Sequence, residues 1–413
     1  MRSFQADYVF PVNAPPLEKG ILLTEDDGTV IELLPADATI RLQDMGVLLE
    51  THKGILVPGF VNTHCHLELS CMKGQISPKK GIAGFVSEFV AKRNSFNDEE
   101  RKLAIEQAEK EMILNGIVAV GDISNGADTF GLKAKSNLYY HTFIECFDLN
   151  PSKTEESFGR ALSLRDEWLR LSPGSGKQIS VVAHAPYTVT PHLLLKICAL
   201  ARERGSILSF HNQESEAENE MFTVGKGSLM EMYKKMGLDL SWFKVSGQSS
   251  LRSVLPCYEG VGKVLLVHNT YTSKEEVQWA EHCSEQMSKA KTNPASSQRI
   301  YWATCPGANL YIENRMPEYA FFAGQEHAVT IGTDSLASNG SLSVLEELKL
   351  IIEHSPEISL ETGMRWATLN GAEFLGIDKQ FGSFEKGKKP GVVWITDAGL
   401  SKLSSGSSAR RLV

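Results

Sequence analysis

The sequence lacks the features that mark secreted, membrane-spanning and nucleic-acid-binding proteins. Its seven cysteines are an odd number and show no paired CxxC spacing, which favours reduced thiols over a disulfide framework. No stretch reaches the about 18 apolar residues of a membrane span, and the N-terminus lacks the apolar core of a signal peptide. The net charge is −8 and no run of Lys and Arg occurs, so we expect no nucleic-acid partner. These absences together predict a cytoplasmic protein.

The composition is that of a soluble globular protein. Hydrophobic residues make up 42% of the 413 residues and charged residues 22%, which indicates neither disorder nor a membrane role. The chain is longer than one hydrophobic core usually holds, although α/β barrels often exceed about 250 residues as a single domain. We therefore expect one large domain and a smaller one.

Eight β-rich apolar runs recur along the chain, and helical patterns lie between most of them. The runs begin near residues 54, 116, 138, 179, 206, 263, 299 and 328. Helical patterns such as those over 98–116 and 190–205 have apolar residues at steps of three and four and close with Gly. Apolar strands that alternate with helices are typical of parallel strands joined by crossovers. The pattern predicts an α/β fold, a (β/α)₈ TIM barrel with its active site at the carboxyl ends of the strands.

The two ends of the chain are expected to lie outside this barrel. The segment GILLTEDDGTVIELL has the turn residues of a hairpin between two apolar stretches, and KGKKPGVVWITDAG reads as a further strand near the C-terminus. We predict a small β-sandwich-like domain built from residues 1–56 and 383–413, beside a barrel over residues 57–382.

The sequence also supports predictions for three further segments. Residues 70–97 and 212–260 are longer than plain connections between strand and helix, so they are predicted to shape a substrate pocket. The segment SKLSSGSSARR over 401–411 is expected to fray.

Several of the apolar runs are followed immediately by polar side chains. In NTHCHLELS, His64 and His66 share one face of a strand, so both rings can reach a single ion, whereas Cys65 points to the opposite face. His211 and Asp334 end two later runs and would add a nitrogen and an oxygen. Such a set suits Zn²⁺, with Fe²⁺ as the alternative, and leaves the open position that a catalytic metal site keeps for water. A bound divalent ion would make hydroxide available near pH 7.

Two more side chains lie near this predicted metal site. Glu214 follows His211 by three residues and could move protons to a substrate without binding the metal. His268 ends the sixth run and could hydrogen-bond the water or orient the reacting group. The simpler interpretation is structural, because neighbouring carbonyls can satisfy histidines and a loop glutamate is often only solvated. The matching positions at several strand ends favour the catalytic interpretation.

These motifs together resemble the amidohydrolase superfamily, and within it the branch of nucleobase and nucleoside deaminases. The resemblance covers nearly the whole chain and rests on PGFVNTHCH, FHNQES, VHN, CPGAN, GTDSLASN and FGSFEKGKKPGVVWI. It implies the metal ligands and the roles of Glu214 and His268 given above. Binuclear members carry a modified lysine at the end of strand four, where this chain reads VVAHAPYT, so a single metal ion is implied.

The resemblance also suggests substrate contacts. HCHLELS is more similar to aminodeoxyfutalosine deaminases than to adenosylhomocysteine and methylthioadenosine deaminases, and Glu68 and Ser70 carry this preference. His184 matches a position that helps to hold the substrate in nucleoside-type deaminases. Phe85 and Glu88 are candidates for holding base and ribose, and Glu68 is either a substrate contact or a structural partner beneath the metal ligands. The tail departs from the family pattern in KKPGVV, which touches only the small domain.

The implied activity is hydrolytic deamination of an aminopurine nucleoside-like compound, foremost aminodeoxyfutalosine to futalosine and ammonia, a step of menaquinone biosynthesis. Water would attack the ring carbon that bears the amine. Asp334 would take the proton of the water, Glu214 would protonate the ring nitrogen, and His268 would polarise the attack. The family commonly forms assemblies, so we expect a homodimer or a higher homo-oligomer.

Several alternatives stay open at this point. One is deamination of adenosylhomocysteine or methylthioadenosine. Others are a cytosine or guanine deaminase and a triazine chlorohydrolase, since one fold supports many reactions. From another class, the protein could be a barrel that binds a metal or a nucleoside without catalysis.

Overall fold

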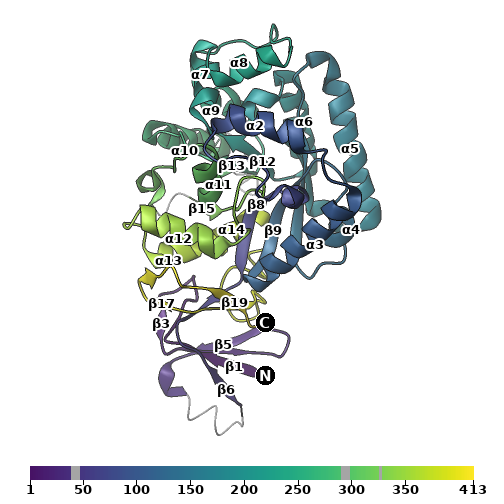
Figure 1. Ribbon diagram of the computed structural model, residues 1–413. Coiled ribbons are helices and arrows are strands. Elements are labelled where there is room, and N and C mark those ends of the chain that lie inside the picture. Colours follow the sequence, from purple (N-terminus) through teal and green to yellow (C-terminus); the bar gives the residue numbers. More distant parts are fainter. Residues whose placement is uncertain (39–46, 290–297, 325–327) are drawn as a thin grey trace.

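The eight apolar runs are all parallel β-strands in the computed structural model, which describes residues 1–38, 47–289, 298–324 and 328–413 (Figure 1). The strands are β8 (Phe60–Cys65), β9 (Ile117–Ser124), β10 (Tyr139–Cys146), β11 (Ile179–Ala183), β12 (Leu208–Asn212), β13 (Lys263–His268), β14 (Arg299–Thr304) and β15 (Val329–Ile331). Nearly every residue of these strands is buried, as expected for a sheet covered on both faces. The α/β fold class is therefore confirmed.

The described strands form two four-stranded sheets and not one closed eight-stranded barrel. Their orders are β11-β10-β9-β8 and β12-β13-β14-β15. The sheets meet at two seams: His211 N donates to His184 O (2.9 Å) at one, and Asp334 N donates to His64 O (3.1 Å) at the other. At the second seam, Cys65 and Asp334 form an isolated parallel bridge, three residues beyond the end of β15.

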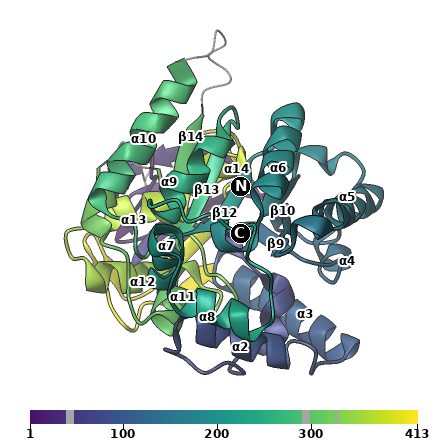
Figure 2. The ribbon, with the colours of Figure 1, turned by 90° about the horizontal axis from the view of Figure 1, so that it is seen from above.

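Helices surround the strands, as the view from above shows (Figure 2). The predicted helices over 98–116 and 190–205 are confirmed as α3 (Asp98–Leu114) and α6 (Pro191–Arg204). Asn97 begins α3 with a capping box, in which its side chain accepts from Glu100 N and its own N–H donates to Glu100. Gly205, at φ 64°, ends α6 in the left-handed conformation that glycine adopts readily. The other helices outside the two long insertions are α4 (Phe130–Lys133), α5 (Thr154–Leu171), α10 (Lys274–Lys289), α11 (Pro306–Ile312), α12 (Val344–His354), α13 (Leu360–Ala367), α14 (Leu369–Leu375) and the 3₁₀ turns η1 (Ala36–Ala38), η3 (Pro151–Lys153), η4 (Ser175–Lys177), η5 (Pro186–Thr188) and η8 (Tyr319–Phe322).

Strands from both ends of the chain pair with one another below these two sheets (Figure 1). One sheet has the order β5-β4-β1-β6, and a second has the order β19-β16-β7-β2-β3. Their bounds are β1 (Arg2–Gln5), β2 (Tyr8–Val9), β3 (Leu17–Glu18), β4 (Ile21–Thr24), β5 (Val30–Leu34), β6 (Leu49–Thr51), β7 (Ile55–Pro58), β16 (Val392–Ile395) and β19 (Ala409–Arg411). The predicted hairpin is the antiparallel pair β4 and β5. The domain limits at residues 56 and 383 stay a prediction.

The expectation that residues 401–411 fray is wrong. The segment contains β18 (Lys402–Leu403), which pairs with β17 (Ala398–Gly399), and β19, which runs antiparallel to β16. Its composition is that of a flexible tail, but β16 offers it an unpaired edge, and composition alone cannot reveal a partner elsewhere in the chain.

The two long insertions lie at the opposite end of the sheets from the termini (Figure 1). The first contains η2 (Leu67–Met72) and α2 (Gly81–Lys92). The second contains α7 (Glu216–Val224), α8 (Ser228–Lys235), α9 (Ser250–Val254) and η6 (Leu255–Tyr258). Among the described residues, no helix is both long enough and apolar enough to cross a membrane.

Candidate active site

The four predicted metal ligands meet at the carboxyl ends of the strands. His64 and His66 come from β8, His211 from β12, and Asp334 follows β15; one ligand atom of each lies within 4.8 Å of the others, and all four residues are buried. His64 Nε2 and His66 Nε2 are 3.2 Å apart, and Asp334 Oδ1 lies 3.7 Å and 3.4 Å from them. Cys65 is buried but is not a member of this group. The arrangement can hold a divalent metal ion.

In two of these side chains, one polar atom forms a hydrogen bond outside the cluster, and the other polar atom is left for the cluster. His211 Nδ1 lies 2.7 Å from the carbonyl oxygen of His184, to which it donates, so Nε2 is the nitrogen left for the cluster. Asp334 Oδ2 accepts from Ser338 Oγ at 2.5 Å, so Oδ1 is the oxygen that faces the histidines. Metal-binding histidines and carboxylates commonly have such outer partners, which orient the ligand atom.

The ionisation of three of the four side chains, His64, His66 and Asp334, also suits a metal. Burial lowers the pKa of His64 to about 4 and lowers that of His66 as well. Burial opposes the charge of Asp334, but the bond to His64 and the nearby imidazole of His66 lower its pKa below the ordinary value. His211 differs, because the carboxylates around it outweigh burial and raise its pKa. Neutral imidazoles and an ionised carboxylate are the forms that coordinate a cation.

Four non-glycine residues at these strand ends have a positive φ. The φ angles are 44° at Gln213, 74° at His268, 57° at Asn269 and 55° at Asp334. This conformation costs an ordinary residue about 1 to 3 kcal/mol and is found most often at functional sites. Of these side chains, His268 and Asp334 line the cavity, whereas Gln213 donates to Asn219 in α7 and to Glu276 in α10.

Glu214 and His268 form a pair beside the metal ligands. His268 Nε2 lies 3.4 Å from Glu214 Oε2. The hydroxyl of Tyr187 donates to Glu214 Oε1, and His268 Nδ1 bonds Asn309 Oδ1 at 2.8 Å. Each of the two side chains therefore has a second partner that holds it in place. The structure brings the predicted catalytic residues and the predicted metal ligands together.

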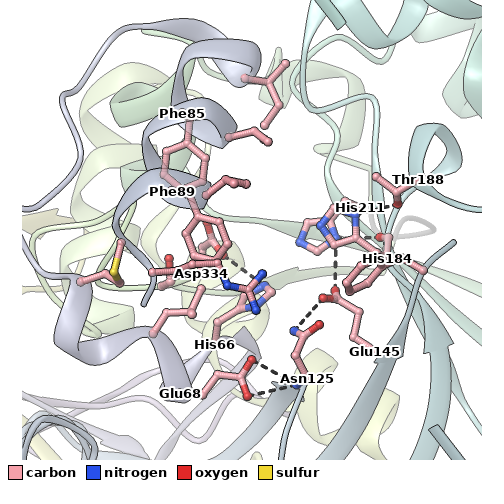
Figure 3. Close-up of a pocket in the computed structure, with 18 of the residues that line it drawn as sticks. His66, Glu68, Phe85, Phe89, Asn125, Glu145, His184, Thr188, His211 and Asp334 are labelled. Atoms are coloured by element: carbon pink, nitrogen blue, oxygen red, sulfur yellow. Dashed lines mark hydrogen bonds and ion pairs between the residues drawn. The ribbon is translucent and has the colours of Figure 1, made fainter. Parts of the chain in front are cut away.

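A cavity of about 480 Å³ opens onto this group of side chains (Figure 3). Its wall includes three of the four side chains predicted to bind substrate, His184, Glu68 and Phe85. The wall does not include Glu88, whose carboxylate instead accepts from Ser77 N (3.1 Å) and from Lys92 Nζ (3.0 Å). The role proposed for Glu88 stays a prediction that this geometry does not support. Both insertions contribute to the wall.

The sequence-based interpretation missed a chain of polar contacts at one side of the cavity. Asn125 joins two carboxylates, the partly buried Glu68 and the buried Glu145. Its N–H donates to Glu68, at 3.1 and 3.0 Å from the two oxygens, and its Nδ2 donates to Glu145 at 2.9 Å (Figure 3). Burial raises the pKa of Glu68 to about 7 and also raises that of Glu145. Glu145 and Asn125 both lie at the ends of predicted strands, and this position was the signal that could have identified them.

Tyr187, Asn309 and Ser338 were also missed, although each stands in a motif that the sequence made visible. They lie in HAPYT, CPGAN and TDSLASN. Each of the three side chains bonds a predicted site residue. A search of the sequence for the spacing of metal ligands therefore does not find them.

The sequence matches the model of the amidohydrolase family over residues 55–404, which is most of the chain. The chain belongs to this family. Membership confirms the resemblance inferred from the motifs and the predicted class of enzyme, a hydrolase that acts on carbon–nitrogen bonds.

Several proteins named as deaminases are similar to this chain over most of its length. An adenosine deaminase of Helicobacter pylori is 26% identical over 343 residues, which cover 81% of this chain and 77% of the relative. An aminodeoxyfutalosine deaminase of Nitratiruptor sp. is 25% identical over 328 residues, covering 78% of this chain and 75% of the relative. The crystal structure of H. pylori aminofutalosine deaminase with methylthio-coformycin has a TM-score of 0.77 at 21% identity, covers 97% of this chain and 94% of that chain, and shows the same fold.

Proposed function

We propose that the protein is a metal-dependent deaminase of an aminopurine nucleoside, with aminodeoxyfutalosine as the foremost substrate. The observation that carries this proposal is the buried group of four ligand-type side chains with the Glu214 and His268 pair beside it. A protein that only binds a nucleoside has no need of a proton-transferring carboxylate at this place. The names of the relatives, which include adenosine and aminodeoxyfutalosine deaminases, favour the same activity.

One ion fits the described residues, and we propose Zn²⁺, although the same ligands accept Fe²⁺. When bound, such an ion lowers the pKa of a water molecule toward neutrality. A second group, formed by Glu145, His184 and His211, also has ligand-type atoms within 4.8 Å. His211 Nδ1 donates to a backbone carbonyl and its Nε2 belongs to the first group, so the second group keeps only Glu145 and His184 as ligands of its own. We therefore propose a single ion.

The side chains around the ion divide the proton transfers. Asp334 Oδ1, on the cluster side, accepts the proton of the attacking water while Ser338 holds the other oxygen. Glu214, acting as a general acid, gives its proton to the ring nitrogen of the purine and regains one from the hydroxyl group added to the ring carbon. The proton taken up by Asp334 passes to the amine, and the carbon–nitrogen bond breaks to release ammonia. Tyr187 keeps this carboxylate in place, and His268 orients the attacking water.

The remaining predicted contacts hold the nucleoside. His184 and Phe85 line the cavity as an imidazole and a phenyl ring, both suited to a flat base, and Glu68 lies where a hydroxyl can bond. We further infer that the two four-stranded sheets act as one (β/α)₈ barrel, since the ligands come from both. A homodimer or larger assembly stays a prediction.

The test is ammonia release by the zinc-loaded protein from a panel of compounds. Release from adenine nucleosides with a 5′ extension supports the proposal, release only from free bases or triazines replaces it with the alternative hydrolases, and no release with metal bound indicates a binding protein. Glu214→Gln is expected to lower kcat by at least about 100-fold with zinc content unchanged. Glu216→Gln is the matched control, because this exposed residue stands two positions away in α7.

A further inference from the structure

Glu218 is a fully buried glutamate in α7, close to the turn that carries Glu214. Among the described residues, no Lys, Arg or His forms an ion pair with it. Burial raises the pKa of Glu218 to about 8, and the nearby carboxylate of Glu214 adds to the rise. An unpaired carboxylate in such a place is costly to the folded state, so stability alone does not explain a glutamate here.

Both oxygens of Glu218 accept hydrogen bonds from the backbone of the turn that follows β12. Oε1 accepts from Gln213 N at 3.0 Å, and Oε2 accepts from Glu214 N at 3.2 Å. In a capping box the third helical residue accepts instead from the N–H of the N-cap residue, which in α7 is Ser215. The carboxylate of Glu218 therefore reaches past the helix end and bonds the two residues before the cap.

The two bonds hold a backbone shape that the turn does not favour by itself. Gln213 has a φ of 44°, which a residue other than glycine adopts at a cost. The carbonyl oxygen of Gln213 accepts from Tyr271 N at 3.0 Å, so the turn is also tied to the loop after β13. For the N–H of Glu214, the partner is the carboxylate of Glu218.

The side chain of Glu214 is thereby fixed at both of its ends. At the carboxylate end, Tyr187 donates to Oε1, and His268 Nε2 lies 3.4 Å from Oε2. At the backbone end, Glu218 holds the N–H. A proton donor must lie within hydrogen-bond reach of the atom that it protonates, and a shift of about 1 Å can lower a rate about 100-fold.

We propose that Glu218 is a positioning residue for the general acid: its carboxylate holds the backbone of Gln213 and Glu214, so that the side chain of Glu214 meets His268. The assignment rests on the proposed function, which makes Glu214 the proton donor. Glu218 is not among the residues that line the cavity, so it acts through Glu214 and not on the substrate. Its loss therefore affects kcat and leaves substrate binding unchanged.

Glu218→Gln tests the assignment with little change in size. The substitution replaces one acceptor oxygen with an amide nitrogen that only donates, so one of the two backbone bonds is lost. For the nucleoside of the panel that reacts fastest, we expect the kcat of zinc-loaded protein to fall about 10-fold, with KM and zinc content unchanged. Glu220→Gln is the matched control, because Glu220 is an exposed glutamate of the same helix.

The Glu214→Gln background shows whether Glu218 acts through Glu214. There, Glu218→Gln should leave the residual rate unchanged, because the effects of residues that act as a unit do not add. An equal fall in both backgrounds would overturn the proposal, as would an unchanged kcat in the parent protein or a Glu218→Gln protein that does not fold.

Amide hydrogen exchange separates this proposal from the proposed function. If the parent protein releases ammonia from no compound, the proposed deamination fails, and the two backbone bonds are then tested without catalysis. In Glu218→Gln, the amides of Gln213 and Glu214 should exchange faster while those inside α6 do not change. Unchanged exchange at Gln213 and Glu214 would show that Glu218 does not hold the turn.

Discussion

At the scale of single residues, the site depends on side chains that never face the substrate. Asp334 has a strained backbone, and one of its two carboxylate oxygens is held by Ser338. Without that bond the carboxylate can rotate about its last torsion, which is broad and has no strongly preferred angle. The serine hydroxyl therefore selects the rotamer in which Oδ1 faces His64 and His66.

This role makes Ser338 a positioning residue with a measurable effect. Ser338→Ala is expected to weaken zinc binding about 10-fold, at the low end of the range for outer partners of metal ligands. Competition with a chromogenic chelator gives the affinity, and Ser341→Ala, three residues further along, is the matched control. An unchanged zinc affinity in Ser338→Ala would show that backbone strain alone orients the carboxylate.

At the scale of elements, a buried ion pair joins α4 to β9 next to the turn that follows His66. Lys133 Nζ contacts Asp122 and bonds Ser124 Oγ at 2.9 Å, and both charged side chains are fully buried. Asp122 Oδ1 also accepts from Leu67 N at 2.8 Å, and Leu67 follows His66. The short helix α4 thus holds in place the turn that leaves the ligand strand.

Removing one member of this pair is expected to be costly. Lys133→Met leaves the carboxylate of Asp122 buried without its counter-ion, and such changes destabilise a protein by about 3 to 5 kcal/mol. Urea unfolding of metal-free protein measures the loss, with Lys135→Met, an exposed lysine just after α4, as the control. The double variant Asp122→Asn with Lys133→Met should recover part of the stability; if it is no more stable than Lys133→Met, the loss comes from packing and not from the unpaired charge.

Local pattern was enough to predict the elements and to select candidate metal ligands. The strands are apolar runs, and His64, His66, His211 and Asp334 stand at their ends, so period and position were sufficient. Contacts between distant segments were beyond the reach of the pattern. Glu145 meets Asn125 because β9 and β10 are neighbouring strands. Helix α2 lines the cavity because it packs against α8 and α11, which are distant in the sequence.

At the scale of the whole molecule, the proposed metal ligands come from both sheets. His64 and His66 belong to the sheet that ends in β8, whereas His211 and Asp334 belong to the sheet of β12 to β15. The backbone joins these sheets by few hydrogen bonds, such as His66 N to Asp334 O at 3.4 Å. A bound ion would therefore act as a cross-link at the place where the backbone pairing is weakest.

Metal removal is accordingly expected to loosen the seams before it affects either sheet. A ligand that binds only the folded state stabilises it by about 2.7 kcal/mol at 100 times its Kd, so dialysis against a chelator should lower the melting temperature and zinc should restore it. Hydrogen exchange locates the effect: the amides of His66, His211 and Asp334 at the seams should exchange faster in metal-free protein, while those inside β9 and β13 change little. Equal acceleration across all strands would mean that the ion stabilises the fold as a whole, and no acceleration at the seams would mean that the two sheets close without it.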